Sequence, residues 1–201
     1  MSINSKKTQD SKLYSYILVG DNGGAPCVEN DCLTIAICKP VIRKNGNVGD
    51  MVVGISSYKL GKKKKIIFIA VITKMIPMQE YASFRRPDSI YTSDLKMRPN
   101  AFHTNCHSNT DLKGKNVIMS TDFIYFGKNN IDVPSHLSGI IPGRGHQSNK
   151  NRPFKQKLLN LFTKEKRKGV GKIGDYTGKK SNCGKATRGK ATRGKANCGK
   201  S

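Results

Sequence analysis

The chain has 201 residues, with 37 Lys and Arg against 13 Asp and Glu, which gives a formal net charge of +24. An excess of this size indicates a polyanionic partner. No apolar run approaches the roughly 20 residues of a membrane span, and the first residues are too polar for a signal peptide, which argues against membrane and secreted proteins. We therefore expect an intracellular protein, in the cytoplasm, a nucleus or a viral particle, with its six cysteines reduced.

Short apolar segments rich in Ile and Val dominate the first 150 residues. They are bounded by Gly, Asn, Asp and Lys, and they predict strands of a sheet that is covered on both faces. The expected strands are 13–19, 33–38, 51–56, 66–73, 117–120 and 122–126, with a helix at 78–84 and an irregular section at 85–116. This order predicts an α+β fold with a small, mixed β-barrel-like core and marginal helices, in contrast to an alternating βαβ sheet.

The positive charge is concentrated in one predicted hairpin and in the C-terminal quarter. Residues 1–149 carry 20 basic and 11 acidic residues, a net of +9, and residues 150–201 carry 17 and 2, a net of +15. Four consecutive lysines in the connection 58–65 are expected at the tip of a hairpin as phosphate ligands: Lys62, Lys63, Lys64 and Lys65. Without these four, the first part has a net charge of +5, an ordinary value for a folded domain.

The C-terminal quarter divides into a helical and a repetitive part. Apolar residues recur at helical spacing in 153–169, which predicts an amphipathic helix whose apolar face docks on the body or else on a partner. From Gly184 the chain repeats GKATR, and we expect a disordered arm in which Arg188 and Arg193 bind phosphates, or else a tail that only aids solubility. The predicted organisation is a flexible N-terminus (1–11), a domain (12–149), an amphipathic helix (150–168) and a disordered basic tail (169–201).

Three segments in a fixed order resemble a known family. Tyr14, Tyr16, Asp21, Ala25 and Pro26 precede CLTIAICKPVIRKNGNVGD (32–50), and NVIMSTDFIYFGKNNIDVP (116–134) and GRGH (143–146) follow. Together they resemble the nucleotide modification associated domain 2 family over about residues 14–147. The resemblance implies a role in DNA base or nucleotide modification, as an enzyme or as a reader of the altered base. By structural analogy, the strand pair at 49–57 and 66–81 also resembles that of the small barrels of the PUA, EVE and ASCH group, some of which hold a flipped or modified base.

Two groups of cationic and aromatic residues in these segments are candidate ligands. Lys39 and Arg43 follow a predicted buried strand and suit phosphate, unless they are only a solvated strand end. In GRGH, Arg144 is a candidate for phosphate and His146 for binding the ligand or transferring a proton, unless the glycines serve only turns. Tyr16 is a candidate for stacking on a base, although aromatic residues in strands more often pack in the core.

The remaining candidates concern a turn and a metal. Asp50 either shapes a turn or accepts hydrogen bonds from a base. His103, Cys106 and His107 form HxxCH, but the paired cysteines that would complete a zinc site are absent, so we expect no metal and no other cofactor. For catalysis the sequence offers only His146.

We expect a nucleic-acid-associated protein, bound to DNA more readily than to RNA and to no membrane. A modified base or nucleotide would occupy a barrel pocket while the tail contacts phosphates. Two alternatives stay open: an enzyme of base or nucleotide modification, and a DNA-packaging protein in which the tail is the function. The oligomeric state is left open.

Overall fold

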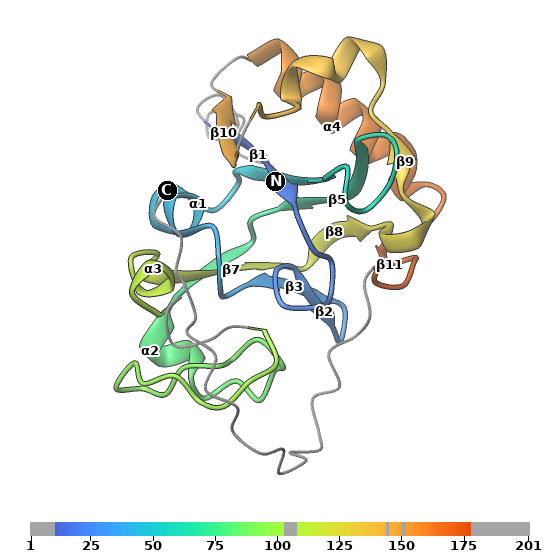
Figure 1. The fold of residues 1–201 in the computed structure, drawn as a ribbon. Helices are drawn as coiled ribbons and strands as arrows, with labels where there is room; N and C mark the ends of the chain where they lie inside the picture. The colour runs from blue at the N-terminus through green and yellow to red at the C-terminus, as the bar shows by residue number, and fades with distance from the viewer. Residues whose placement is uncertain (1–10, 103–107, 144, 150–151, 178–201) are drawn as a thin grey trace.

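The computed structural model describes residues 11–102, 108–143, 145–149 and 152–177, and it has an α+β fold with two sheets and few helices (Figure 1). The large sheet has the order β10 (His146–Asn149), β1 (Leu13–Leu18), β4 (Met51–Ser56), β5 (Lys65–Val71), β8 (Asp122–Tyr125) and β11 (Gly171–Lys172), and β9 (Ile131–Asp132) pairs with β5. The small sheet has the order β2 (Cys27–Glu29), β3 (Cys32–Ile35), β7 (Asn116–Ser120) and β6 (Lys74–Pro77). The α+β class is confirmed, but the described strands do not close into a barrel.

A bent pair of strands joins the two sheets. β5 leads into β6 through Thr73, and β7 leads into β8 through Thr121, so the two connections lie side by side at the bend. There the Thr73 N–H donates to the Met119 carbonyl (2.9 Å), and the Thr121 N–H donates to Thr73 Oγ1 (3.1 Å). These bonds keep the backbone paired where the sheets change direction, and the small sheet therefore folds against the large one.

Alternate residues of β1 supply two cores. Tyr14 and Tyr16 pack between the two sheets, whereas Leu13 faces the opposite side of the large sheet. That side is covered by α4 (Arg152–Lys166), which contributes the buried Phe162 (Figure 1). The strand is buried on both faces because its side chains alternate between two covered surfaces.

The other helices are short and lie at the margins of the sheets. They are α1 (Pro40–Asn45), α2 (Met78–Tyr81) and α3 (Ser108–Leu112), with 3₁₀ turns at Gly127–Asn129 and Ser135–Ile140. The strand expected at 33–38 ends at Ile35, and α1 begins five residues later: Pro40 suits the first helical turn, and Ile42 is buried in the core. Among the described residues, no helix is long and apolar enough to cross a membrane.

The segment after α4 is part of the fold, in contrast to the disordered tail expected from residue 169. β11 runs parallel to β8, the Ile173 N–H donates to the Tyr125 carbonyl (3.0 Å), and Tyr176 is buried. The sequence concealed this because the segment is rich in Gly and Lys and has few apolar residues. The rest of the predicted tail, 178–201, and most of the predicted N-terminal arm, 1–10, lie outside the described residues.

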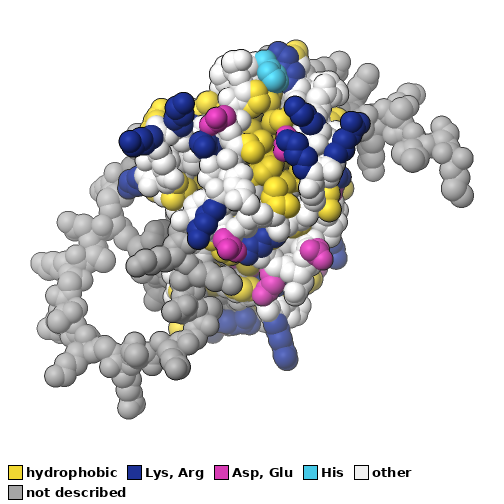
Figure 2. All heavy atoms as spheres, turned by 90° about the vertical axis from the view of Figure 1, so that its right-hand side faces the viewer, with side chains coloured by type: hydrophobic (Ala, Val, Ile, Leu, Met, Phe, Trp, Pro, Cys, Tyr) yellow, Lys and Arg dark blue, Asp and Glu magenta, His cyan; other side chains and the backbone are white. Residues whose placement is uncertain are grey.

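The surface near α4 and β11 is both apolar and basic. Leu159, Val170 and Ile173 are among the exposed large hydrophobic residues. Figure 2, which views the right-hand side of Figure 1, shows a band of hydrophobic side chains flanked by Lys and Arg.

Buried tyrosines make the stability of this fold sensitive to alkali. Burial raises the pKa of Tyr14 to about 12 and raises the pKa of Tyr16 and of Tyr125 well above the ordinary value. Since tyrosine in an unfolded chain ionises near pH 10, the unfolded state loses these protons first, and stability is lost as the pH rises from about 10 to 12 and beyond. We expect the free energy of urea unfolding, followed by circular dichroism, to fall over this range.

Tyr14→Phe is the control for that effect. It removes one titrating hydroxyl together with its 2.8 Å hydrogen bond to the Asn45 carbonyl. The variant should start less stable at neutral pH, yet lose less stability than the parent between pH 10 and 12. An equal loss in both proteins would contradict the contribution of Tyr14.

Candidate functional site

Ile17, near the end of β1, connects two segments that are far apart in the sequence. Its N–H donates to the Gly145 carbonyl at 3.1 Å, and its carbonyl accepts from Lys39 Nζ at 3.3 Å. The register of β1 and β10 pairs Tyr16 with His146 at the same place. Of the predicted ligand residues, Tyr16, Lys39 and His146 are thus brought together, and we call these three, with Ile17 and Gly145, the Ile17 corner.

Lys39 has an unusual backbone and an unusual environment. It adopts φ 45° and ψ 46°, and the preceding Cys38 has φ 56°, both in the left-handed region that side chains with a Cβ rarely occupy. Its ammonium lies 4.5 Å from the centroid of the Tyr16 ring, and burial lowers its pKa. Strained backbone of this kind is enriched at functional sites. The half-buried Lys39 is therefore the strongest candidate in the corner for binding an anion.

Arg43 and Asp111 hold the strained turn at Cys38 and Lys39. The Cys38 N–H donates to Asp111 Oδ1 (2.7 Å), and Arg43 Nη1 donates to the Cys38 carbonyl (3.2 Å). Other hydrogen bonds from Arg43 go to the carbonyls of Ala36, Asn116 and Asp111. Arg43 was predicted as a phosphate ligand, but it is fully buried and its guanidinium is occupied by backbone oxygens. Its role is to position the backbone around Lys39.

The Tyr16 ring packs against the Lys39 ammonium and has no exposed face on which a base could stack. The side chain is fully buried, and its hydroxyl donates to the Ala25 carbonyl at 3.4 Å. Burial, followed by the nearby Cys38 and Asp21, raises its pKa well above the ordinary value. The neutral ring therefore provides an electron-rich surface for the ammonium, the usual geometry of a cation–π contact.

The lysine-rich hairpin begins at the same end of the large sheet. β1 and β4 run parallel, and the Ser57 N–H donates to the Leu18 carbonyl (2.9 Å), so the connection between β4 and β5 starts beside the Ile17 corner. The predicted hairpin is confirmed by the antiparallel pairing of β4 and β5. Lys62 and Lys63 are exposed, and Lys64 lies 5.4 Å over the ring of Tyr58.

Two of the predicted ligands belong to other parts of the fold. Lys65 is already in β5, where it forms an ion pair of 3.7 Å with Asp132. Asp50 is buried and accepts hydrogen bonds from the N–H groups of Lys12 (2.6 Å) and Asn47 (2.9 Å), as its turn-shaping alternative predicts. Lys12 precedes Tyr16 by four residues, or about 13 Å along a strand. Arg43, Asp50 and His146 therefore do not share one pocket.

Asp21 forms a buried clasp that the sequence interpretation missed. Its carboxylate accepts hydrogen bonds from the Tyr125 hydroxyl (2.7 Å) and from the N–H (3.0 Å) and hydroxyl (2.9 Å) of Thr177. The loop that carries Asp21 starts at the Ile17 corner and returns to it, since Ala25 accepts from the Tyr16 hydroxyl. The presence of Asp21 in the first family segment was a signal for this contact.

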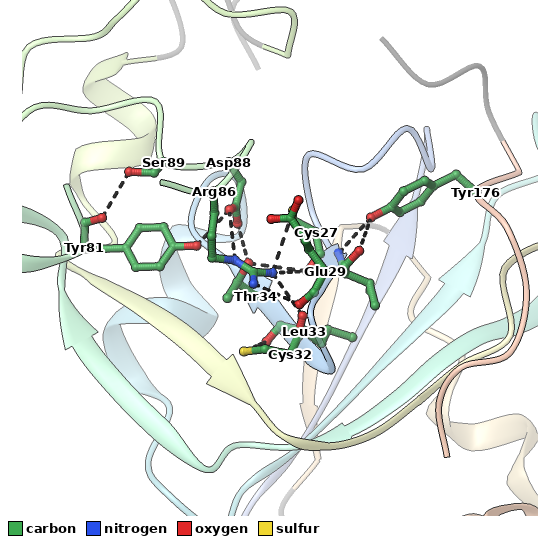
Figure 3. A network of polar contacts seen from close by, with 11 residues as sticks. Cys27, Glu29, Cys32, Leu33, Thr34, Tyr81, Arg86, Asp88, Ser89 and Tyr176 are labelled. Atoms are coloured by element: carbon green, nitrogen blue, oxygen red, sulfur yellow. Dashed lines mark hydrogen bonds and ion pairs between the residues drawn. The ribbon is translucent and has the colours of Figure 1, made fainter. Parts of the chain in front are cut away.

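A second buried network surrounds Arg86 and Asp88 (Figure 3). Arg86 donates to the carbonyls of Glu29 and Cys32, both at 3.0 Å. Asp88 accepts from Thr34 Oγ1 (2.6 Å) and the Tyr81 hydroxyl (2.8 Å), and burial raises its pKa. A hydroxyl on a carboxylate can serve as a nucleophile with its base, but both groups are buried here, and they fix the loop after α2 onto the β2–β3 hairpin.

Other sequence candidates lie outside the described residues: Arg144, Arg188 and Arg193 for phosphate, and His103, Cys106 and His107 for metal. Within the described ranges, no group of three His, Cys, Asp or Glu side chains is placed to hold a metal ion. Cys27 is not a reactive thiol, because burial raises its pKa to about 12. The described residues of the corner thus offer an ammonium, an imidazole and backbone groups.

The comparison with protein families gives one match. The family model described as nucleotide modification associated domain 2 matches residues 10–93 and 87–179. The match continues through the segment after α4, beyond the resemblance found in the sequence, which ended near residue 147. Neither the curated proteins nor the solved structures contain a match to this chain.

Substitutions at Lys39 measure the strain in its backbone. Lys39→Ala and Lys39→Gly both remove the ammonium, but only glycine adopts φ 45° without a steric penalty. We expect the glycine variant to be more stable than the alanine variant by about 1 kcal/mol in urea unfolding. The same pair of substitutions at Lys44, which is exposed and helical in α1, should give the opposite order by about 1 kcal/mol. Equal stabilities of the two Lys39 variants would mean that the left-handed backbone carries no strain.

Proposed function

The chain belongs to the nucleotide modification associated domain 2 family, and on this premise we propose that it binds a nucleotide unit, as part of DNA, at the Ile17 corner. The observation that carries the proposal is the half-buried ammonium of Lys39, held over Tyr16 by a strained turn. A solvated surface lysine needs no such support. A cation held in place before its ligand arrives loses less conformational entropy when it binds.

The phosphate of that unit would contact Lys39, with the hairpin lysines beside it. Lys39 donates one hydrogen bond within the described residues, to Ile17, and an ammonium has three N–H donors. Lys62, Lys63 and Lys64 add positive charge at the same end of the sheet and would contact neighbouring phosphates. Contacts of this type give affinity and salt dependence but little sequence selectivity.

Recognition of a modified base would come from the groups around the corner. His146 is exposed beside the buried Tyr16, and its imidazole can donate or accept a hydrogen bond. We also propose that the bent two-sheet core is an open counterpart of a PUA-like barrel, with the base near the loop between β1 and β2. The bend shared by the two sheets and the buried glycines of that loop, Gly23 and Gly24, support this proposal.

A second candidate function is an enzyme that modifies bases or nucleotides. It is favoured by the lowered pKa of Lys39, because a desolvated lysine is a better base or nucleophile near neutral pH than a solvated one. Incubation with nucleotides and with DNA containing modified bases, followed by mass spectrometry, separates the two functions. A product that Lys39→Met abolishes indicates the enzyme, and saturable binding without product indicates the reader.

Removal of the proposed phosphate contacts should weaken DNA binding. In fluorescence anisotropy with a labelled oligonucleotide, Lys39→Met should lower the affinity about tenfold, as expected for one lost charged contact. Lys62→Gln, Lys63→Gln and Lys64→Gln together should lower it further and reduce the slope of log affinity against log salt by about 2 to 3.

The matched control removes the same charge elsewhere. Lys74→Gln, Lys113→Gln and Lys164→Gln replace three exposed lysines on β6, after α3 and on α4. This triple variant should bind more tightly than the hairpin variant. Equal weakening by the two triple variants would show that only net charge matters, and the hairpin lysines would lose their role as local phosphate contacts.

A further inference from the structure

Tyr58 is an aromatic side chain that the fold leaves in water. All seven tyrosines of the chain lie within the described residues, and Tyr58 is 70% exposed whereas the other six are at most 7% exposed. The phenylalanines are all described as well, and each is buried or partly buried. A single exposed apolar side chain is ordinary on a protein surface, so the surroundings of Tyr58 decide what its ring can do.

The surroundings of Tyr58 are cationic. It lies in the connection between β4 and β5, where residues 57–64 contain four Lys and no acidic residue. Three of these lysines are exposed, and the fourth, Lys64, lies 5.4 Å over the Tyr58 ring. Proteins bind single-stranded nucleic acid with the same combination, in which the cations contact phosphates and the rings stack on bases.

The connection holds Tyr58 in a defined position. The Leu60 N–H donates to the Ser57 carbonyl (3.0 Å) and closes a β-turn around Tyr58, and the Leu60 side chain packs against the core between the two sheets. Behind the turn, Ser56 Oγ accepts from the Lys65 N–H (2.8 Å). The ring thus projects from a turn that is anchored on both sides. A ring held in this way loses less conformational entropy on binding than one on a free loop.

The turn that carries Tyr58 lies next to the Ile17 corner. The Ser57 N–H donates to the Leu18 carbonyl, and the residue before Leu18 binds Lys39 through its carbonyl. Val19, which is 59% exposed, begins the loop between β1 and β2 at the same end of the sheet. One strand spacing and one residue step place the backbone of Tyr58 on the order of 10 Å from the Lys39 ammonium. One nucleic-acid strand can therefore contact both residues.

We propose that Tyr58 stacks on an unpaired base of the DNA strand whose phosphate contacts Lys39. The inference rests on the proposed function and specifies its substrate class, which is single-stranded DNA in contrast to intact duplex. Bases within a duplex are already stacked on their neighbours, so Tyr58 gains a contact only where a base is unpaired. The hairpin lysines contact the phosphates of either form.

Substitution of Tyr58 separates stacking from charge. The probes are a labelled single-stranded oligonucleotide of about 16 nucleotides and the duplex that it forms with its complement. In fluorescence anisotropy, Tyr58→Ala should lower the affinity for the single strand about tenfold, the loss expected for one stacked base, and leave the affinity for the duplex nearly unchanged. The slope of log affinity against log salt should equal that of the parent, because no cation is removed.

Two controls accompany this variant. Tyr58→Phe keeps the ring and removes the hydroxyl, so it should bind both probes like the parent. Val48→Ala shortens another exposed apolar side chain, at the opposite end of β4, and should change neither affinity. Since all of these side chains are exposed, we expect the melting temperature of each variant to equal that of the parent.

Tyr58→Trp reports the stacking directly. The chain contains no tryptophan, so this variant carries a single indole whose fluorescence can be followed by itself. Stacking of a base on the indole quenches its emission. We expect the unlabelled single strand to quench it saturably, with a midpoint equal to the dissociation constant from anisotropy, and the duplex to quench it little.

The outcomes separate this inference from the proposed function. If Lys39→Met weakens binding of the single strand while Tyr58→Ala does not, the corner binds nucleotides and the inference is overturned. The inference is also overturned if Tyr58→Ala weakens the single strand and the duplex equally, or if the single strand leaves the indole unquenched. If Lys39→Met changes neither affinity, the proposed function fails and the inference fails with it.

Discussion

A buried carboxylate must be neutralised or hydrogen-bonded, and this requirement organises the loops of the fold. Four aspartates are buried among the described residues, and three of them accept a hydrogen bond from a tyrosine hydroxyl. The pairs are Asp21 with Tyr125, Asp88 with Tyr81, and Asp111 with Tyr91. Each pair joins a loop or short helix to another part of the chain, so irregular segments acquire fixed positions that their few apolar residues would not give them.

The Asp111 pair shows how such a bond reaches the candidate site. Asp111 also accepts from the Cys38 N–H, and the buried Arg43 donates to the carbonyls of Ala36 and Cys38. Removing one partner of a buried charged group lowers the stability of the fold. These contacts can therefore maintain a left-handed backbone at residues other than glycine, which rarely adopt it. The position of Lys39 at the Ile17 corner depends on them, although neither Asp111 nor Arg43 is exposed to a ligand.

The strands were predictable from sequence because their signal is local. Runs of Ile and Val identified β4 to its exact bounds and most of β1, β5, β7 and β8. The edge strands β2, β6, β10 and β11 have two to four residues and no apolar pattern, so only tertiary pairing defines them. Barrel closure was overpredicted for a related reason: periodicity shows that a strand is covered but does not show which edges pair.

The candidate site was predicted in part, and the failures follow from burial. Lys39 was identified as a cation at a strand end and His146 as an imidazole beside glycines, and the fold brings them together. Arg43 follows Lys39 by four residues and has a similar sequence context. It lies in the first turns of α1, however, where its side chain points inward and donates to the Asp111 carbonyl of α3. Whether a cation faces a ligand or the backbone depends on which carbonyls surround it, and these come from residues up to 73 positions away.

The burial and pairing of carboxylates in this fold affect the charge at its surface. A domain that uses part of its carboxylates in internal hydrogen bonds and ion pairs leaves fewer negative groups at its surface to repel a polyanion. Asp21, Asp88 and Asp111 lie inside, and Asp122, Asp132 and Glu165 are paired with lysines. The positive field near the end of β1 then comes from Lys39 and the hairpin lysines. Because screening weakens such a field within about 10 Å at moderate salt, cations must be close together to act on one phosphate chain.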